Sequence, residues 1–183
     1  MSTNFTVIIQ SELKMSFKFK TKNTDGTLVY FSNNDESDFL RISLVDGYVR
    51  LIVTITDYQG STEVLEFDSY YSHADGQEHQ VDIIIENDER DDCKAVEMTI
   101  TGGASSYTDY NFDRLYTLDM LESNGMLMVG GDSAQNDSQH HNSNLDGCMA
   151  QLTINDIAVH FIDDARHTGP INAQQNADQS ASC

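Results

Sequence analysis

The chain has 183 residues, of which 39% are hydrophobic, and this length fits one domain with a sizeable core. Its 30 acidic and 10 basic side chains give a formal net charge of −20. That balance excludes nucleic acid and anionic membrane surfaces as partners, because phosphate binding needs clustered Lys and Arg. It favours cations or basic partners instead.

Short strand-like segments recur along the chain and are separated by turn signals. Residues 15–20 alternate apolar and polar side chains with period two, as a half-buried strand does. Asp25-Gly26 and Asp46-Gly47 favour tight turns. In chain order, we expect strands at 5–9, 15–20, 27–31, 39–44, 48–55, 64–67, 79–85, 95–100 and 126–129, and a last one opened by Gly147 and Cys148.

This spacing predicts an all-β fold, namely an antiparallel β-sandwich or jelly roll of the concanavalin-like kind. The single proline agrees with long regular ladders, because proline breaks interior strand pairing. Only residues 115–121 resemble a short helix, and residues 86–92 are expected to form a charged loop. No repeat or linker divides the sequence, so we expect one domain over residues 1–183. Its tail, 169–183, is expected to be poorly ordered unless Cys183 pins it.

Residues 126–160 hold the most distinctive pattern in the chain. An apolar run ends in Gly130-Gly131, a polar loop follows over 132–144, and Gly147-Cys148 opens the next strand. The loop is rich in oxygen- and nitrogen-bearing side chains, among them Asp132, Asp137, His140, His141, Asn142 and Asn144. Two strands around such a loop, with a cysteine at the re-entry, predict a functional site rather than a plain connection.

Three cysteines, Cys93, Cys148 and Cys183, allow one disulfide and one free thiol. Asn4 and Asn136 each begin a match to the N-glycosylation acceptor pattern. The sequence shows neither an apolar run of about 18 residues, as a transmembrane helix requires, nor a charged-then-apolar leader. We therefore expect either a cytosolic protein or a domain of a longer secreted chain.

Five segments in this order resemble the laminin G-like domains, also called LNS domains, and above all those of neurexin-type cell-surface receptors. They are 19–21 with 26–30, then 38–47, then 75–81, then 129–131, and finally Leu145, Gly147 and Cys148 with Leu152 and Asn155. The third segment matches the family's Asp-Gly-x-Trp-His-x-Val, but it holds Glu78 where the family has Trp. The chain has no tryptophan, so we expect Tyr70, Tyr71 or Phe67 to fill that space.

The resemblance implies a sandwich of two curved antiparallel sheets without catalysis, so we expect no enzyme. It implies a recognition module in cell adhesion or in synaptic or matrix organisation, either secreted or part of the ectodomain of a membrane receptor. Such domains commonly carry Ca²⁺ at a rim of loops and bind a cell-surface or matrix protein, or a glycan, around it. We expect no contact with nucleic acid and no direct contact of this segment with a membrane.

The calcium ligands of the family map onto four positions of this chain. Asp38 matches the aspartate just before a strand, and Asp137 best matches the one in the loop after Gly-Gly, with Asp132 as its competitor. Main-chain carbonyls near Ile55 and Asn144 would complete the set. Such a site would be weak, with a dissociation constant of about 10⁻⁴–10⁻³ M. The alternative is that Asp38 is an ordinary loop aspartate in a very acidic protein.

The resemblance also implies a closing disulfide between Cys148 and Cys183, which would leave Cys93 unpaired and buried. In the chain-entropy model, a closed loop of this length contributes about 3–4 kcal/mol of stability. A glycan on Asn136 would crowd the calcium loop, so the two features compete.

Three other functions are compatible with parts of this sequence. A transition-metal site at His140 and His141 is disfavoured, because adjacent strand residues point to opposite faces. The alternative function is a lectin-like or polysaccharide-active sandwich, which would need two nearby acids and, for sugar stacking, aromatic side chains. Glu89 falls on the opposite face from Glu86 and Asp88, and the chain has no tryptophan. A structural domain without a ligand is the third possibility.

Overall fold

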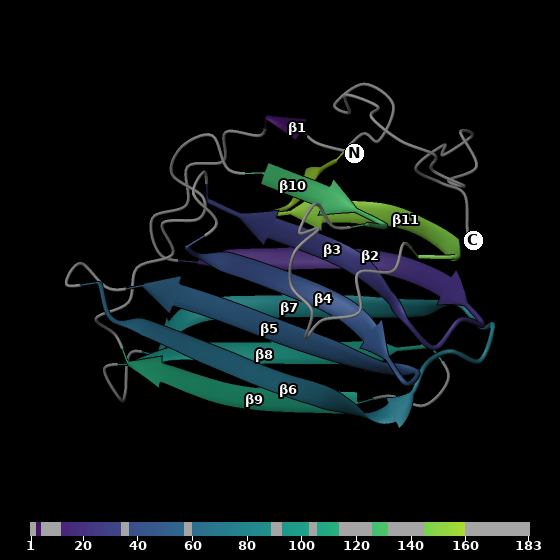
Figure 1. Ribbon diagram of the computed structural model, residues 1–183, viewed down its shortest axis with the longest axis horizontal. Coiled ribbons are helices and arrows are strands. Elements are labelled where there is room, and N and C mark those ends of the chain that lie inside the picture. Colours follow the sequence, from purple (N-terminus) through teal and green to yellow (C-terminus); the bar gives the residue numbers. More distant parts are fainter. Residues whose placement is uncertain are drawn as a thin grey trace.

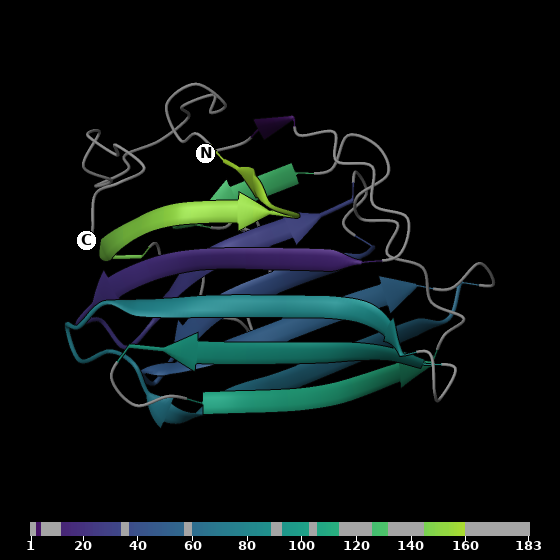
Figure 2. The same ribbon diagram turned by 180° about the vertical axis from the view of Figure 1, so that it is seen from behind.

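The structure of this protein is a computed structural model, and it describes residues 3–4, 12–33, 37–56, 60–88, 93–102, 106–113, 126–131 and 145–159. Two six-stranded antiparallel sheets stack face to face, and the described residues contain no helix (Figures 1 and 2). No candidate for a membrane-spanning helix occurs in that part of the chain. The predicted all-β sandwich is confirmed.

Hydrogen bonding orders the strands within each sheet. In the first sheet the order is β1 (Thr3–Asn4), β10 (Met126–Val129), β3 (Gly26–Ser32), β4 (Phe39–Val45), β5 (Tyr48–Thr56) and β6 (Thr62–Ser72). In the second sheet it is β12 (Ile157–Ala158), β11 (Gly147–Ile154), β2 (Leu13–Thr21), β7 (His79–Asp88), β8 (Cys93–Thr101) and β9 (Ser106–Asp113). The connection from β6 to β7, residues 73–78, passes from one sheet to the other, and we call it the crossover.

Strand β2 illustrates how the sequence builds the core. Its inward side chains are almost fully buried, namely Leu13, Met15, Phe17 and Phe19, whereas Lys14 and Lys20 are exposed. A side-chain period of two places the first set between the sheets and the second in solvent. Burial of one such large apolar side chain stabilises the fold by about 1.5–3 kcal/mol. The alternation in the sequence therefore determines both the strand and its inward face.

The strand ends define two ends of the sandwich. At the Asp38 end, β3 and β5 finish while β4, β6 and β10 begin, since Ser32 pairs with both Phe39 and Met126. At the His73 end, β4 turns into β5, the crossover enters β7, and β10 finishes. Figure 1 shows the arrowheads of β3 and β5 at the Asp38 end, on the left, and β4 pointing to the opposite end.

Two segments differ from the prediction. Strand β7 runs on to Asp88, so Glu86 and Asp88 lie in a strand rather than in a charged loop, because they pair with Ala95 and Cys93 on β8. The sequence does not predict β9, whose mostly polar residues lack a strict apolar–polar alternation. Pairing with β8 holds β9 at the edge of its sheet. The segments predicted at 5–9, 115–121 and 169–183 lie outside the described residues.

Candidate functional site

Asp38 is a buried carboxylate at the start of β4. Its side chain is 3% exposed, and its Oδ1 accepts a hydrogen bond from the Thr56 N–H at 2.7 Å. Because this peptide bond is trans, the Ile55 carbonyl of the same peptide group points away from the Asp38 carboxylate that accepts the Thr56 N–H. Asp38 and Ile55, two of the predicted ligand positions, are therefore neighbours whose oxygen atoms do not converge. A hydrogen bond from a main-chain N–H to a charged carboxylate is stronger than a neutral one.

The two connections at this end hold Asp38 in place. The Asn33 N–H donates to the Asp38 carbonyl at 3.0 Å, and the Asp38 N–H donates to Asn33 Oδ1 at 3.2 Å. The Thr56 hydroxyl lies 3.5 Å from the Ser37 carbonyl and 3.2 Å from the Thr62 hydroxyl. The β3–β4 and β5–β6 connections are thus tied to each other, and the carboxylate has a fixed position.

A buried carboxylate at the end of a sandwich suits a hard cation such as Ca²⁺, which takes six to eight oxygen ligands at about 2.3–2.6 Å. Among the described residues, no three His, Cys, Asp or Glu side chains gather as a metal site. Asp38 and Ile55 therefore stay predicted ligands, and a Ca²⁺ ion would need further oxygens from residues outside the described part of the chain or from water.

The predicted loop ligands Asp137 and Asn144, and the competitor Asp132, lie outside the described residues. The described flanks of their loop lie at the His73 end, where the Gly130 N–H donates to the Leu28 carbonyl and the Leu145 N–H donates to the Gly130 carbonyl. A seven-residue strand such as β4 separates this end from Asp38 by about 20 Å.

Covalent geometry limits what this loop can contribute at the Asp38 end. Asn144 precedes Leu145, and consecutive Cα atoms are about 3.8 Å apart, so Asn144 is the proposed ligand least compatible with Asp38. Asp137 follows Gly131 by six residues, and an extended chain of that length reaches about 20 Å. The reach of these six residues thus equals the distance between the two ends, and Asp137 stays a predicted ligand.

A second polar cluster, which motif matching alone does not predict, lies at the His73 end. The Nδ1 atoms of His73 and His79 are 3.4 Å apart, and His79 Nε2 lies 2.8 Å from Asp75 Oδ1. Burial and, to a smaller extent, His79 lower the pKa of His73 to about 4, although Asp75 acts in the opposite direction. Burial alone would raise the pKa of Asp75, but the Gln77 N–H and His79 hold it below its usual range.

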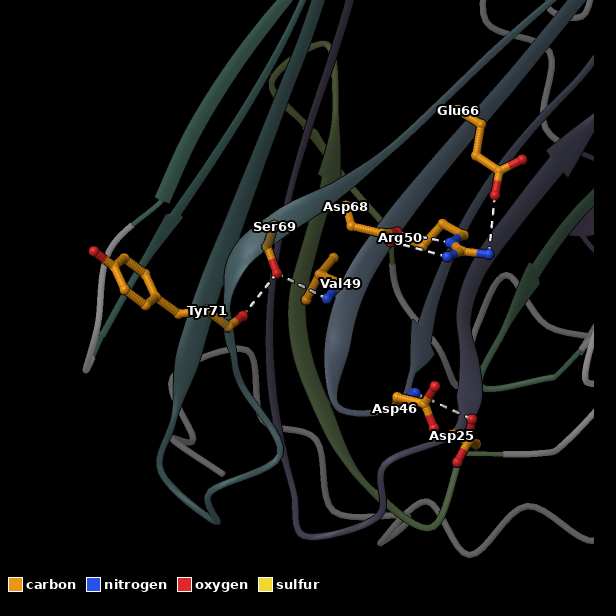
Figure 3. Close-up of polar contacts among 8 residues, drawn as sticks. All are labelled: Asp25, Asp46, Val49, Arg50, Glu66, Asp68, Ser69 and Tyr71. Atoms are coloured by element: carbon orange, nitrogen blue, oxygen red, sulfur yellow. Dashed lines mark hydrogen bonds and ion pairs between the residues drawn. The ribbon is translucent and has the colours of Figure 1, made fainter.

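Of the three alternatives for the space of the missing tryptophan, Phe67 is the one that is buried. Tyr70 and Tyr71 are 69% and 54% exposed, and only Phe67 packs in the core. A bulge turns the two tyrosines outward: Ser69 Oγ accepts from the Val49 N–H at 3.0 Å and donates to the Tyr71 carbonyl at 2.8 Å (Figure 3). A register shift of this kind cannot be read from composition.

On the outer face of the first sheet, Arg50 binds the carboxylates of Asp68 and Glu66. Arg50 makes two hydrogen bonds to Asp68, at 2.6 and 2.9 Å, and an ion pair with Glu66 at 2.9 Å (Figure 3). The hydrogen bond to Asp68 raises the pKa of Arg50, although burial lowers it. Acids bound in this way differ from the pair of free carboxyl groups that glycoside hydrolysis uses.

The remaining predicted positions are only partly described. Cys148, at the start of β11, is disulfide-bonded, and its predicted partner Cys183 lies outside the described residues. Cys93 lies in β8 and Asn4 in β1. Asn136, in the 132–144 loop, is also outside the described residues, as are His140 and His141. The pairing Cys148–Cys183 and the glycosylation of Asn4 and Asn136 stay predictions.

Comparison with known proteins gives consistent matches. Residues 19–157 match the family model described as the laminin G domain. Over 96 residues the chain is 29% identical to Neurexin-3a of Danio rerio, a match that covers 50% of this chain and 5% of that protein.

Two solved structures share the fold. The LG1-3 region of the laminin alpha2 chain has a TM-score of 0.68 at 16% identity, covering 86% of this chain and 30% of that one. Domains LG4-5 of the mouse laminin alpha1 chain have a TM-score of 0.67 at 11% identity, covering 91% and 42%. The chain thus spans well under half the length of each of these relatives.

Proposed function

This chain belongs to the laminin G domain family, and we propose that it is a non-catalytic extracellular recognition module that binds its partner at a Ca²⁺-containing rim. The partner is a cell-surface or matrix protein, or a glycan, in cell adhesion or in synaptic or matrix organisation. The laminin and neurexin relatives, which are extracellular or cell-surface proteins, support this role. The net charge of −20 favours a cation and a basic partner.

The observation that carries the calcium proposal is the environment of Asp38. Asp38 is 3% exposed, yet it lies at the end of the sandwich, and its carboxylate accepts the Thr56 N–H at 2.7 Å. Buried carboxylates are usually paired, hydrogen-bonded or bound to a metal. A buried carboxylate held at a rim by a main-chain N–H therefore supports the proposal of a Ca²⁺ site at this end.

The proposed ligand set is Asp38, Ile55, Asp137 and Asn144. Asp38 and Ile55 both lie at the Asp38 end, whereas Asp137 and Asn144 belong to a loop whose described flanks lie toward the His73 end. The experiment must therefore separate a site that needs the loop from one that does not.

Isothermal titration calorimetry with CaCl₂ tests this proposal, with an expected dissociation constant of about 10⁻⁴–10⁻³ M. Asp38→Asn should abolish the binding heat, because it removes the carboxylate charge while keeping the side-chain shape. Asp68→Asn is the matched control, since it removes a carboxylate on the outer face of β6 and should leave the heat unchanged. Unchanged binding in Asp137→Asn would remove the loop from the ligand set.

Two results would refute the metal proposal as a whole. One is no binding heat together with an unchanged melting temperature at millimolar Ca²⁺. The other is wild-type Ca²⁺ binding by Asp38→Asn. Binding of candidate matrix and cell-surface proteins, measured with Ca²⁺ and with EGTA, then tests whether the rim carries recognition.

A further inference from the structure

Two buried histidines and one aspartate form a hydrogen-bonded chain at the His73 end. His73 and His79 are both 0% exposed, and the His79 ring packs against Phe19 with ring centroids 5.5 Å apart. In the described part of the chain, His73 Nε2 has neither a hydrogen-bond partner nor contact with solvent. The two imidazole rings are thus buried away from water, and His79 connects them to the partly exposed Asp75.

The crossover carries His73 and Asp75, leads into His79 at the start of β7, and is hydrogen-bonded to both sheets. The His73 N–H donates to the Gly47 carbonyl at 2.7 Å, and the Gly76 N–H donates to the Thr21 carbonyl at 2.8 Å. A Cβ atom on Gly102 would overlap the Glu78 carbonyl, so the end of β8 also lies directly against the crossover. Parts of both sheets therefore depend on where the crossover lies.

Thr21 links the crossover to the flank of the 132–144 loop. Its carbonyl accepts the Gly76 N–H, while its hydroxyl donates to the Asp146 carbonyl at 2.7 Å. Thr21 also pairs with Gly147, the first residue of β11. Movement of the crossover would thus disturb the anchor of that loop.

Hydrogen bonding fixes how many protons this cluster can hold. Asp75, as a carboxylate, accepts the His79 Nε2–H, which leaves His79 Nδ1 to accept the Nδ1–H of His73. An added proton has two places to go on the imidazoles. It can sit on His73 Nε2, where a buried N–H would have no acceptor, or it can place two hydrogens between the facing Nδ1 atoms. Either arrangement destabilises the closed form.

Other charged groups around the cluster lie further out. The side chain of Lys22, the residue after β2, lies over Gly76, and Glu78 pairs with Lys18 at 3.2 Å. In the β4–β5 turn, the Asp46 N–H donates to Asp25. The charges that act on His73 are those of His79 and Asp75.

We propose that the cluster of His73, His79 and Asp75 is an acid-sensitive lock on the crossover. The neutral imidazole pair holds the His73 end closed at neutral pH. Acidification drives His73 out into water, frees the crossover, and releases the flank of the 132–144 loop, while the Asp38 end keeps its main-chain contacts.

Hydrogen exchange followed by NMR on the intact chain tests the lock. With a pKa of about 4 closed and 6.5 open, the equilibrium constant for opening should rise about 50-fold from pH 7 to pH 4.5. Protection factors of the His73 and Gly76 amides should fall by that factor, while the Asn33 amide at the Asp38 end keeps its protection. An equal fall at Asn33, or no fall at His73, would overturn the proposal.

His73→Asn separates the lock from general acid effects. The asparagine amide can donate to His79 Nδ1 as His73 does, but it does not titrate, so Gly76 protection should become nearly independent of pH. His140→Asn removes a histidine elsewhere in the sequence and should leave the wild-type pH dependence unchanged. If His73→Asn does not fold, the His73 ring resonances of the wild-type chain still decide the matter, because titration near pH 6.5 would contradict a sealed imidazole.

Discussion

The two ends of the sandwich treat charge in opposite ways. At the Asp38 end, a buried carboxylate is stabilised by a hydrogen bond from the Thr56 N–H. At the His73 end, two buried imidazoles are held in an arrangement that only the neutral pair satisfies. One fold can therefore present charge at one rim and exclude it from the other, because burial penalises charge only where no partner compensates it.

Alanine substitutions of one glycine at each end of the sandwich should lower the free energy of unfolding by different amounts. Gly102 and Gly60 both have positive φ, +91° and +83°, but a Cβ on Gly102 would overlap the Glu78 carbonyl whereas one on Gly60 meets nothing within 4 Å. We expect Gly102→Ala to lower the free energy of unfolding by about 3 kcal/mol or more, and Gly60→Ala by about 1–2 kcal/mol. Urea denaturation measures both, and equal losses would contradict the close approach at the crossover.

Removal of the central imidazole should be nearly as costly. His79→Leu leaves His73 Nδ1 and Asp75 without their shared partner, and we expect a loss of about 2–4 kcal/mol in the free energy of unfolding. Gln77→Leu, a change on an exposed side chain of the same crossover, is the control and should stay within about 0.5 kcal/mol. Thermal and urea unfolding provide the measurement.

Acid should weaken the whole domain through His73. Its pKa is about 4 in the folded state and 6.5 as an isolated group, so the unfolded state binds more protons between these pH values. The contribution is complete above pH 6.5 and is lost as the pH falls to 4, on the order of 3 kcal/mol in total. Urea titrations at half-unit steps should show this slope in the wild type and a shallower one in His73→Asn.

Asp38→Ala should have a smaller effect on stability. It removes the acceptor of the Thr56 N–H, and we expect a loss of about 1–3 kcal/mol, with Asp38→Asn closer to the lower limit because its amide oxygen still accepts. Urea denaturation without Ca²⁺ measures the loss of this hydrogen bond separately from any effect of metal binding. A loss above that of His79→Leu would show that the Asp38 end, not the crossover, dominates stability.

Of these changes, Ca²⁺ binding should alter the free energy of unfolding least. At 1 mM Ca²⁺ and a dissociation constant of about 10⁻⁴–10⁻³ M, linkage predicts about 0.4–1.4 kcal/mol of added stability. A thermal shift that is present in the wild type and in Asp68→Asn, but absent in Asp38→Asn, would place the ion at the Asp38 end.

Much of this fold could be predicted from local pattern. The alternation in β2 and the Asp46-Gly47 turn, where both residues have positive φ, appear in the structure as the sequence indicates. Strand β9 could not be predicted in this way, because an edge strand with polar residues depends on its neighbour rather than on its own periodicity. The outward turn of Tyr70 and Tyr71 depends likewise on a bulge between two strands.

For the candidate site, too, some features could be predicted from the sequence and others only from the tertiary structure. The sequence by itself determined the laminin G resemblance and singled out Asp38 as a predicted calcium ligand, since both rest on residue types in a fixed order. Only the tertiary structure placed Asp38 against Thr56, put the flanks of the 132–144 loop at the opposite end, and joined His73, His79 and Asp75 into one buried chain. The physical reason is that periodicity reports which face of a strand is buried, whereas register and the crossover decide which buried groups meet.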